Sequence, residues 1–214
     1  ANKIFQKDFN PTDNNGLRMG IYYPVGIFYF LFGINSVSAV LYQLVSSLIT
    51  IVVIFYSGKL LFNEKVGLLA SFFLSFFPLD VLYSTQTMGE TPLALFTALS
   101  VFFFLKGERS KRNKIYFYLS GISIGISYLI RESGLIPLLF LFGYFMYTRK
   151  LRLNSAFIFL GLLSIFLFEG IHYAIDNGDF FLRFHEVSGH YGAENAVQDL
   201  GLNVNMDFYP KVMF

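Results

Sequence analysis

Two carboxylates stand in one short polar stretch, LDVLYSTQTMGET, between two apolar segments. They belong to Asp80 and Glu90. Carboxylates this close in a loop can bind a divalent cation or act as general acid and base. We therefore take Glu90 and Asp80 as candidate catalytic residues, and Glu90 as a candidate ligand for a divalent cation, the one cofactor that we consider. A plainer role for Glu90 stays open, because a carboxylate also stabilises the N-terminus of a helix.

A second pair of opposite charges stands in the stretch SYLIRESGLIP, as Arg131 and Glu132. The planar guanidinium of an arginine binds a phosphate through two parallel hydrogen bonds. Arg131 and Glu132 are therefore candidate substrate-binding residues. The alternatives for Arg131 are an anchor at a membrane interface or an ion pair with Glu132.

The elements that position these side chains are strongly apolar. Of the 214 residues, 55% are hydrophobic and 14% are charged, whereas about 25% are charged in an ordinary soluble domain. Cysteine is absent, and 28 Phe and 14 Tyr supply much of the apolar mass. This composition excludes disorder, a disulfide scaffold and a Cys-ligated metal site. The net charge of +2 gives no indication of a nucleic-acid partner.

Long stretches without charge predict helices that cross a membrane. A soluble helix should carry a polar stripe, and the stretch from Ile115 to Ile130 has none. Within it, Gly121 and Gly125 form a pair of small residues four apart, which is typical of close helix packing in membranes. The predicted fold is an all-α, polytopic transmembrane bundle of about six spans, at residues 36–57, 65–80, 91–106, 115–131, 133–148 and 154–175.

The segment from Ile21 to Gly33 is apolar but too short to cross a bilayer alone. It predicts either a helix lying in the membrane interface or an extension of the first span. The predicted organisation is an extracytoplasmic loop with the interfacial helix at residues 1–34, the bundle at 35–175, and an extracytoplasmic loop at 176–214.

Positive charge is concentrated in alternate connections of the predicted bundle. Ten of the 16 basic residues fall in three of them, together with two of the 14 acidic residues. Cytoplasmic loops are enriched in Lys and Arg, so these connections are predicted to face the cytoplasm. An even number of spans then puts both ends of this sequence outside, in a multi-pass protein of the cell membrane.

Short motifs along the chain resemble those of membrane glycosyltransferases of the GT-C fold. The resemblance is to the group of dolichyl-phosphate-mannose protein mannosyltransferases and aminoarabinose transferases. Tyr23-Pro24 leads to Phe32-Gly33 and then to the element Gly58-Lys59-Leu60-Leu61-Phe62. Further matches follow: Pro78, Tyr83, Ser84 and Glu90, with Thr85 where those enzymes have arginine, and Arg131 with Gly134.

The resemblance implies an enzyme that transfers a sugar from a polyprenyl-phosphate-linked donor to a lipid or protein acceptor outside the cytoplasm. It adds Tyr83 to the candidate substrate-binding residues and gives Arg131 the carrier phosphate as its ligand. In such enzymes a catalytic Asp follows the first span, so the resemblance implies that this base lies upstream of Ala1 in a longer protein.

Two other functions remain open at this point, a multi-span transporter or lipid flippase and a non-catalytic membrane scaffold. A carrier should place ionisable residues near the middle of the membrane. Here the charges gather at the helix ends, which favours chemistry at the surface.

Overall fold

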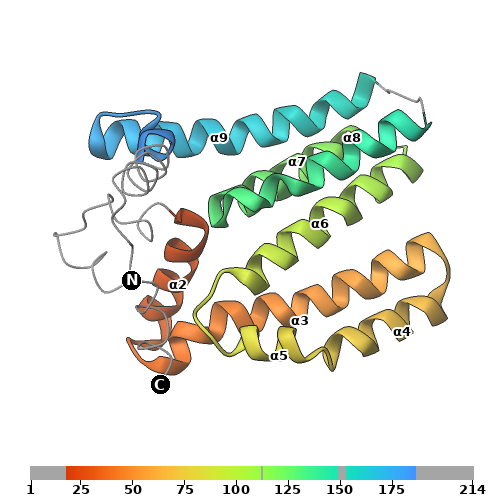
Figure 1. Ribbon diagram of the computed structural model, residues 1–214, viewed down its shortest axis with the longest axis horizontal. Helices are drawn as coiled ribbons and strands as arrows, with labels where there is room; N and C mark the ends of the chain where they lie inside the picture. Colours follow the sequence, from red (N-terminus) through yellow and green to blue (C-terminus); the bar gives the residue numbers. More distant parts are fainter. Residues whose placement is uncertain (1–17, 112, 149–152, 187–214) are drawn as a thin grey trace, which may run out of the picture. The chain divides into compact units, whose positions relative to one another are not determined.

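The computed structural model describes residues 18–111, 113–148 and 153–186. These residues form α-helices and short 3-10 helices, and no strand occurs among them. The elements are α2 (Met19–Phe32), α3 (Ser36–Leu61), α4 (Glu64–Ser75), α5 (Pro78–Ser84), α6 (Glu90–Arg109), α7 (Asn113–Ile130), η1 (Glu132–Leu135), α8 (Ile136–Thr148), η2 (Leu153–Ser155) and α9 (Ala156–Asn177) (Figure 1). The predicted all-α fold is confirmed.

The described helices belong to two compact units, which are treated separately. The first holds Arg18–Glu169 and so contains α2 to α8 with most of α9. The second includes the described residues from Gly170 to Glu186. The predicted division at residues 34 and 175 stays a prediction.

Large apolar side chains cover the outside of the helices instead of filling the inside. Leu139 is 72% exposed, Phe142 64% and Phe159 64%. In water such a surface would be a severe aggregation liability, whereas hydrocarbon tails cover it at no cost. The chain is therefore a membrane protein built from a helix bundle.

The number of spans is lower than the six expected. Three helices are long and apolar enough to cross a membrane, namely α3, α6 and α9. Helices α4 and α5 meet the same standard only as a pair bent by 60°, so the described chain supports three spans, or four with this pair. Helix α2 and the η1–α8 segment are apolar but shorter. Helix α7 has 18 residues and begins with the polar pair Asn113-Lys114, which lowers its overall apolarity.

The predicted helix over 65–80 is broken because of Pro78. The proline ring disfavours helical backbone at the preceding residue, and Phe77 is extended, with φ −71° and ψ 117°. Pro78 itself occupies the first turn of α5, where its missing N–H costs nothing. The predicted helix over 133–148 is also divided, because its first residues form the 3-10 helix η1 before α8 begins.

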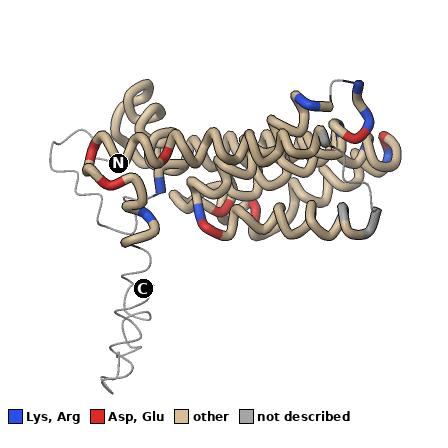
Figure 2. Tube along the Cα trace, turned by 90° about the horizontal axis from the view of Figure 1, so that it is seen from above, with Lys and Arg blue, Asp and Glu red and all other residues tan. Residues whose placement is uncertain are grey.

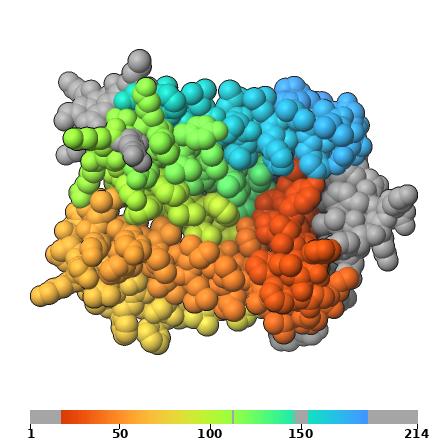
Figure 3. Space-filling model, turned by 180° about the vertical axis from the view of Figure 1, so that it is seen from behind, coloured from red at the N-terminus to blue at the C-terminus, as the bar shows by residue number. Residues whose placement is uncertain are grey.

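Helix α2 is separate from the first span. Gly33 has a φ of +78°, a conformation that glycine adopts without strain, and it ends α2. Asn35 then caps α3, its side-chain oxygen accepting a 2.8 Å hydrogen bond from the Ser38 N–H. In Figure 1, α2 runs across the direction of α3, and Figure 3 shows it lying directly against α3. The structure therefore has a helix of its own at Met19–Phe32, and its place in the membrane interface stays a prediction.

Helices α6 to α9 share a small buried core. Phe104 and Phe117 are fully buried with ring centroids 5.8 Å apart, and Ile124, Leu141 and Ile158 complete the cluster. Helices α7 and α9 meet through glycine: a Cβ on Gly121 would collide with the backbone of Ile158, and one on Gly125 would lie 2.6 Å from the Ile165 Cβ. The predicted close contact at these two glycines is confirmed.

Most of the charged residues gather toward the ends of the bundle (Figure 2), although Glu169 lies within α9. The turn between α3 and α4 and the turn between α6 and α7 carry basic residues, and the opposite end carries the candidate site residues. The described basic residues of the two turns are Lys59, Lys65, Lys106, Arg109, Lys111 and Lys114. The remaining basic residues of the predicted cytoplasmic face, at 112, 149, 150 and 152, lie outside the described part of the chain.

Candidate functional site

Glu90 is the first residue of α6. Gly89 caps this helix and its carbonyl accepts a 2.9 Å hydrogen bond from the Leu93 N–H. The carboxylate thus lies in the first turn, where the helix dipole stabilises negative charge. This is the plainer role considered for Glu90, and the fold supports it.

Arg131 forms the corner between α7 and η1. Its backbone is extended, and it is held on both sides: its N–H donates to the Ser127 carbonyl at 3.1 Å, and its carbonyl accepts from the Gly134 N–H at 2.9 Å. The Ser127 hydroxyl lies 2.8 Å from the Gly134 carbonyl. A Cβ on Gly134 would collide with the Ser127 backbone, so this turn needs glycine. These hydrogen bonds hold the backbone of Arg131 in one position, and this limits where its guanidinium can lie.

The structure brings Glu90 and Arg131 together. Arg131 Nη1 lies 3.1 Å from Glu90 Oε1 and 3.5 Å from Oε2. The two side chains are 49% and 37% exposed, so both remain reachable from solvent. An exposed pair of this kind contributes only about 0–1 kcal/mol to stability. The ion pair therefore adds little to the stability of the fold.

Helix α2 fixes the distance between the two elements that carry this pair. A Cβ on Gly20 would lie 2.9 Å from the Ile130 backbone nitrogen. A Cβ on Gly89 would lie 2.7 Å from Ile21 Cδ1 and 3.0 Å from Ile130 Cγ2. The first turn of α2 thus packs directly on the residues that precede Glu90 and Arg131. Tyr42 of α3 adds a 3.1 Å hydrogen bond from its hydroxyl to the Gly20 carbonyl.

Asp80 makes a different contact from Glu90. Its Oδ2 accepts a 2.5 Å hydrogen bond from the buried Ser47 hydroxyl, which ties α5 to α3. Tyr83 is partly buried on the same short helix, and Glu132 is exposed in η1. The structure therefore joins Glu90 to Arg131, whereas Asp80 is joined to Ser47 on α3.

A metal centre has no obvious place among these residues. Within the described ranges no group of three or more His, Asp or Glu side chains could hold an ion. The divalent cation at Glu90 stays a prediction.

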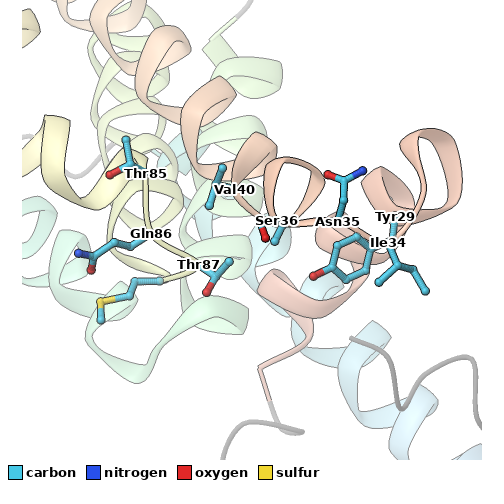
Figure 4. Close-up of a pocket in the computed structure, with 10 residues that line it drawn as sticks. Tyr29, Ile34, Asn35, Ser36, Val40, Thr85, Gln86 and Thr87 are labelled. Carbon is cyan, nitrogen blue, oxygen red and sulfur yellow. The ribbon is translucent and has the colours of Figure 1, made fainter. Parts of the chain in front are cut away.

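An open pocket of about 750 Å³ includes Met88 in its lining, two residues before Glu90 in the sequence. Its walls are the junction of α2 with α3 and the loop between α5 and α6 (Figure 4). Sequence reasoning missed this pocket, because its two walls are about fifty residues apart and no motif joins them. The lining residues are Tyr29, Ile34, Asn35, Ser36, Ala39, Val40, Thr85, Gln86, Thr87 and Met88.

Sequence reasoning did not single out Glu169 as a buried ionisable residue. This carboxylate is 3% exposed although it lies within the apolar helix α9. Ionisable residues within membrane helices usually serve a function, so the signal was present in the sequence.

An apolar helix bundle with a charged and polar site at one end defines a class, that of polytopic membrane proteins with a surface-facing site. Comparison with family models makes this specific. Residues 19–171 match the model of the dolichyl-phosphate-mannose-protein mannosyltransferases, and the chain belongs to that family of GT-C glycosyltransferases. Neither a curated protein nor a solved structure matches the chain.

Proposed function

We propose that this chain carries part of the active surface of a membrane glycosyltransferase that uses a polyprenyl-phosphate-linked sugar. Membership of the mannosyltransferase family supports the class of reaction. The single observation that carries the assignment to residues is the exposed ion pair between Arg131 and Glu90 at one end of the bundle.

In the proposed reaction the acceptor attacks the anomeric carbon of the sugar. A bond forms from the acceptor oxygen or nitrogen to that carbon, and the bond from the carbon to the phosphate oxygen breaks. The electron pair leaves with the carrier phosphate, and the acceptor proton passes to a base. Negative charge therefore grows on the phosphate, and a fixed cation beside it lowers the barrier.

Arg131 is the proposed cation. Its planar guanidinium can bind two phosphate oxygens through two parallel hydrogen bonds. Its backbone N–H and carbonyl are both hydrogen-bonded, and its side chain is half exposed. Glu90 holds the guanidinium in place before the donor arrives. The carboxylate then either stays as an orienting partner or turns to the acceptor.

Asp80, Tyr83 and Glu132 are assigned supporting roles. The Ser47 hydrogen bond makes Asp80 a residue that fixes α5, which carries Tyr83 toward the same loop as Glu90. We propose that Tyr83 and Glu132 contact the substrates, and that the site faces the extracytoplasmic side, since the opposite end carries the basic turns.

The test is a transfer assay with the full-length protein in lipid nanodiscs. A polyprenyl-phosphate hexose labelled in the sugar is the donor, and a nucleotide-linked hexose is the comparison. We expect label to pass to acceptor from the first donor only. Transfer from the nucleotide sugar without any lipid-linked donor would overturn the proposal.

A further inference from the structure

The pocket at the junction of α2 and α3 has unused hydrogen-bonding capacity. Four of its polar side chains make no hydrogen bond within the described part of the chain: Tyr29, Ser36, Gln86 and Thr87. In Figure 4, the Tyr29 ring reaches in from α2 with its hydroxyl toward the side where Thr87 lies. Together these groups offer three hydroxyls and one amide to a ligand.

Other polar groups of the pocket are committed to the fold. The Asn35 side chain caps α3 and donates a 3.1 Å hydrogen bond to the Phe32 carbonyl. The Thr85 hydroxyl donates to the Leu82 carbonyl at 2.8 Å. These bonds fix the two walls, while the four unused groups remain available to the pocket between them.

The lining is neutral. Among the described residues that form the walls there is no Lys, Arg, Asp, Glu or His. A phosphate or a carboxylate would find no compensating charge here, whereas a hydroxyl-rich, uncharged molecule would find both donors and acceptors. The apolar atoms of Tyr29, Val40 and Met88 would cover the less polar face of a sugar ring.

One wall of the pocket, the loop between α5 and α6, ends just before Glu90 of the ion pair. Met88 lines it and Glu90 follows two residues later, so their Cα atoms are at most about 7.6 Å apart. A volume of about 750 Å³ falls in the range of small-molecule sites.

We propose that this pocket is a subsite for an uncharged sugar ring, with Thr87, Gln86 and Tyr29 as its selective contacts. The inference rests on the proposed function for the source of that sugar, which is either the donor hexose or a glycan acceptor. In both cases the pocket selects neutral rings over uronic acids.

The first experiment measures binding without catalysis. Saturation-transfer NMR on the full-length protein in nanodiscs compares a methyl hexoside with the corresponding methyl hexuronide at neutral pH. We expect signal from the hexoside and at least a 5-fold weaker signal from the hexuronide. Thr87→Val and Tyr29→Phe should each reduce the hexoside signal about 3-fold or more, and Thr87→Ser should retain it.

The second experiment identifies the source of the sugar. Loss of one neutral hydrogen bond should raise a KM about 3- to 10-fold. A rise in the KM for the lipid-linked donor assigns the pocket to the donor sugar, and a rise in the KM for a glycan acceptor assigns it to the acceptor. Ser71→Ala is the matched control, because it removes a hydroxyl that bonds only to the Leu68 carbonyl on α4.

Equal signals from hexoside and hexuronide, or variants that leave both binding and both KM values unchanged, would overturn the subsite. This failure differs from that of the proposed function. If the wild-type protein transfers no sugar but binds the hexoside through Thr87, the subsite stands and the donor assignment falls.

Discussion

Replacing Arg131 by alanine should separate catalysis from stability. The Arg131–Glu90 pair is 3.1 Å long, but its side chains are 49% and 37% exposed, so its loss should cost less than about 1 kcal/mol of unfolding free energy. Loss of a fixed charge that stabilises the leaving phosphate should instead lower kcat about 100- to 1,000-fold, which corresponds to roughly 2.7–4 kcal/mol. Arg131→Lys keeps the positive charge but loses the planar guanidinium that makes two parallel hydrogen bonds, so its kcat should lie between those of Arg131→Ala and the wild type.

The matched control is an ion pair at the opposite end of the bundle. Lys59 Nζ lies 3.0 Å from Glu64 Oε2, with side chains 47% and 63% exposed. Lys59→Ala therefore removes a comparable surface pair far from the candidate site in the chain. It should leave both the thermal midpoint and the transfer rate close to the wild-type values.

The assay is transfer of labelled sugar from a polyprenyl-phosphate donor by the full-length enzyme in nanodiscs, with thermal unfolding measured on the same samples. Wild-type turnover by Arg131→Ala would refute the phosphate assignment. So would a loss of turnover that matches an equally large loss of thermal stability, because the pair would then be structural.

Glu90→Gln distinguishes the two proposed roles of the carboxylate, as partner of Arg131 and as a group that contacts the acceptor. If Glu90 only competes with phosphate for Arg131, its neutral variant should bind donor more tightly, with a KM lowered several-fold and kcat unchanged. If the carboxylate orients the acceptor, kcat should fall instead. Unchanged KM and kcat would leave Glu90 no role in the site beyond the start of α6.

Three further outcomes follow from contacts elsewhere in the chain. Gly121→Val should lower stability by about 1–3 kcal/mol, because the added atoms overlap the α9 backbone; thermal unfolding measures this. Ser47→Ala and Asp80→Ala should each cost about 1–3 kcal/mol, and the double variant little more than one alone. The hydrogen bond from His185 lowers the pKa of Asp179, so His185→Ala should raise it in an NMR titration. The stabilisation from this bond is present above the unfolded-state pKa and is lost as the pH falls through the lowered one.

Each of these three predictions has a control variant or an outcome that would contradict it. Gly143→Ala should not destabilise, since a Cβ there meets nothing within 4 Å, and its failure would question the overlap argument for Gly121. Additive losses in the Ser47 and Asp80 double variant would contradict a direct bond. An unchanged Asp179 titration in His185→Ala would contradict the pair with Nδ1 to Oδ2 at 2.7 Å.

The helical fold could be predicted from the sequence because it depends on local signals. Charged residues and caps delimit the helices, and the glycine spacing at Gly121 and Gly125 predicted a close packing face. The number of spans could not be predicted as well, because the absence of charge does not show whether a stretch is long and unbroken enough to cross a membrane. Pro78 already carried the signal for the 60° bend, and Asn113-Lys114 the signal for a less apolar α7.

The candidate site could be predicted residue by residue but not as an arrangement. Glu90 and Arg131 were each chosen on local grounds, yet their pairing depends on how α2 packs against the ends of α6 and α7. That packing follows from the close approach of Ile130 to Gly20 and of the Ile21 and Ile130 side chains to Gly89, which is not visible in the sequence alone. The two carboxylates of the same stretch also have different partners, Ser47 for Asp80 and Arg131 for Glu90.

The arrangement of charge and pocket gives the two halves of a glycosyl donor different environments. A sugar phosphate is anionic at one end and neutral at the other, and a single charged pocket would bind the phosphate of any carrier equally well. Here Arg131 can supply the charge, while the loop before Glu90 supplies neutral hydrogen-bonding groups. Binding of the phosphate would then set affinity, and the neutral groups would set which sugar is accepted. Thr87→Val should therefore change the preference among neutral hexoses, whereas Arg131→Ala should lower the transfer rate from all donors alike.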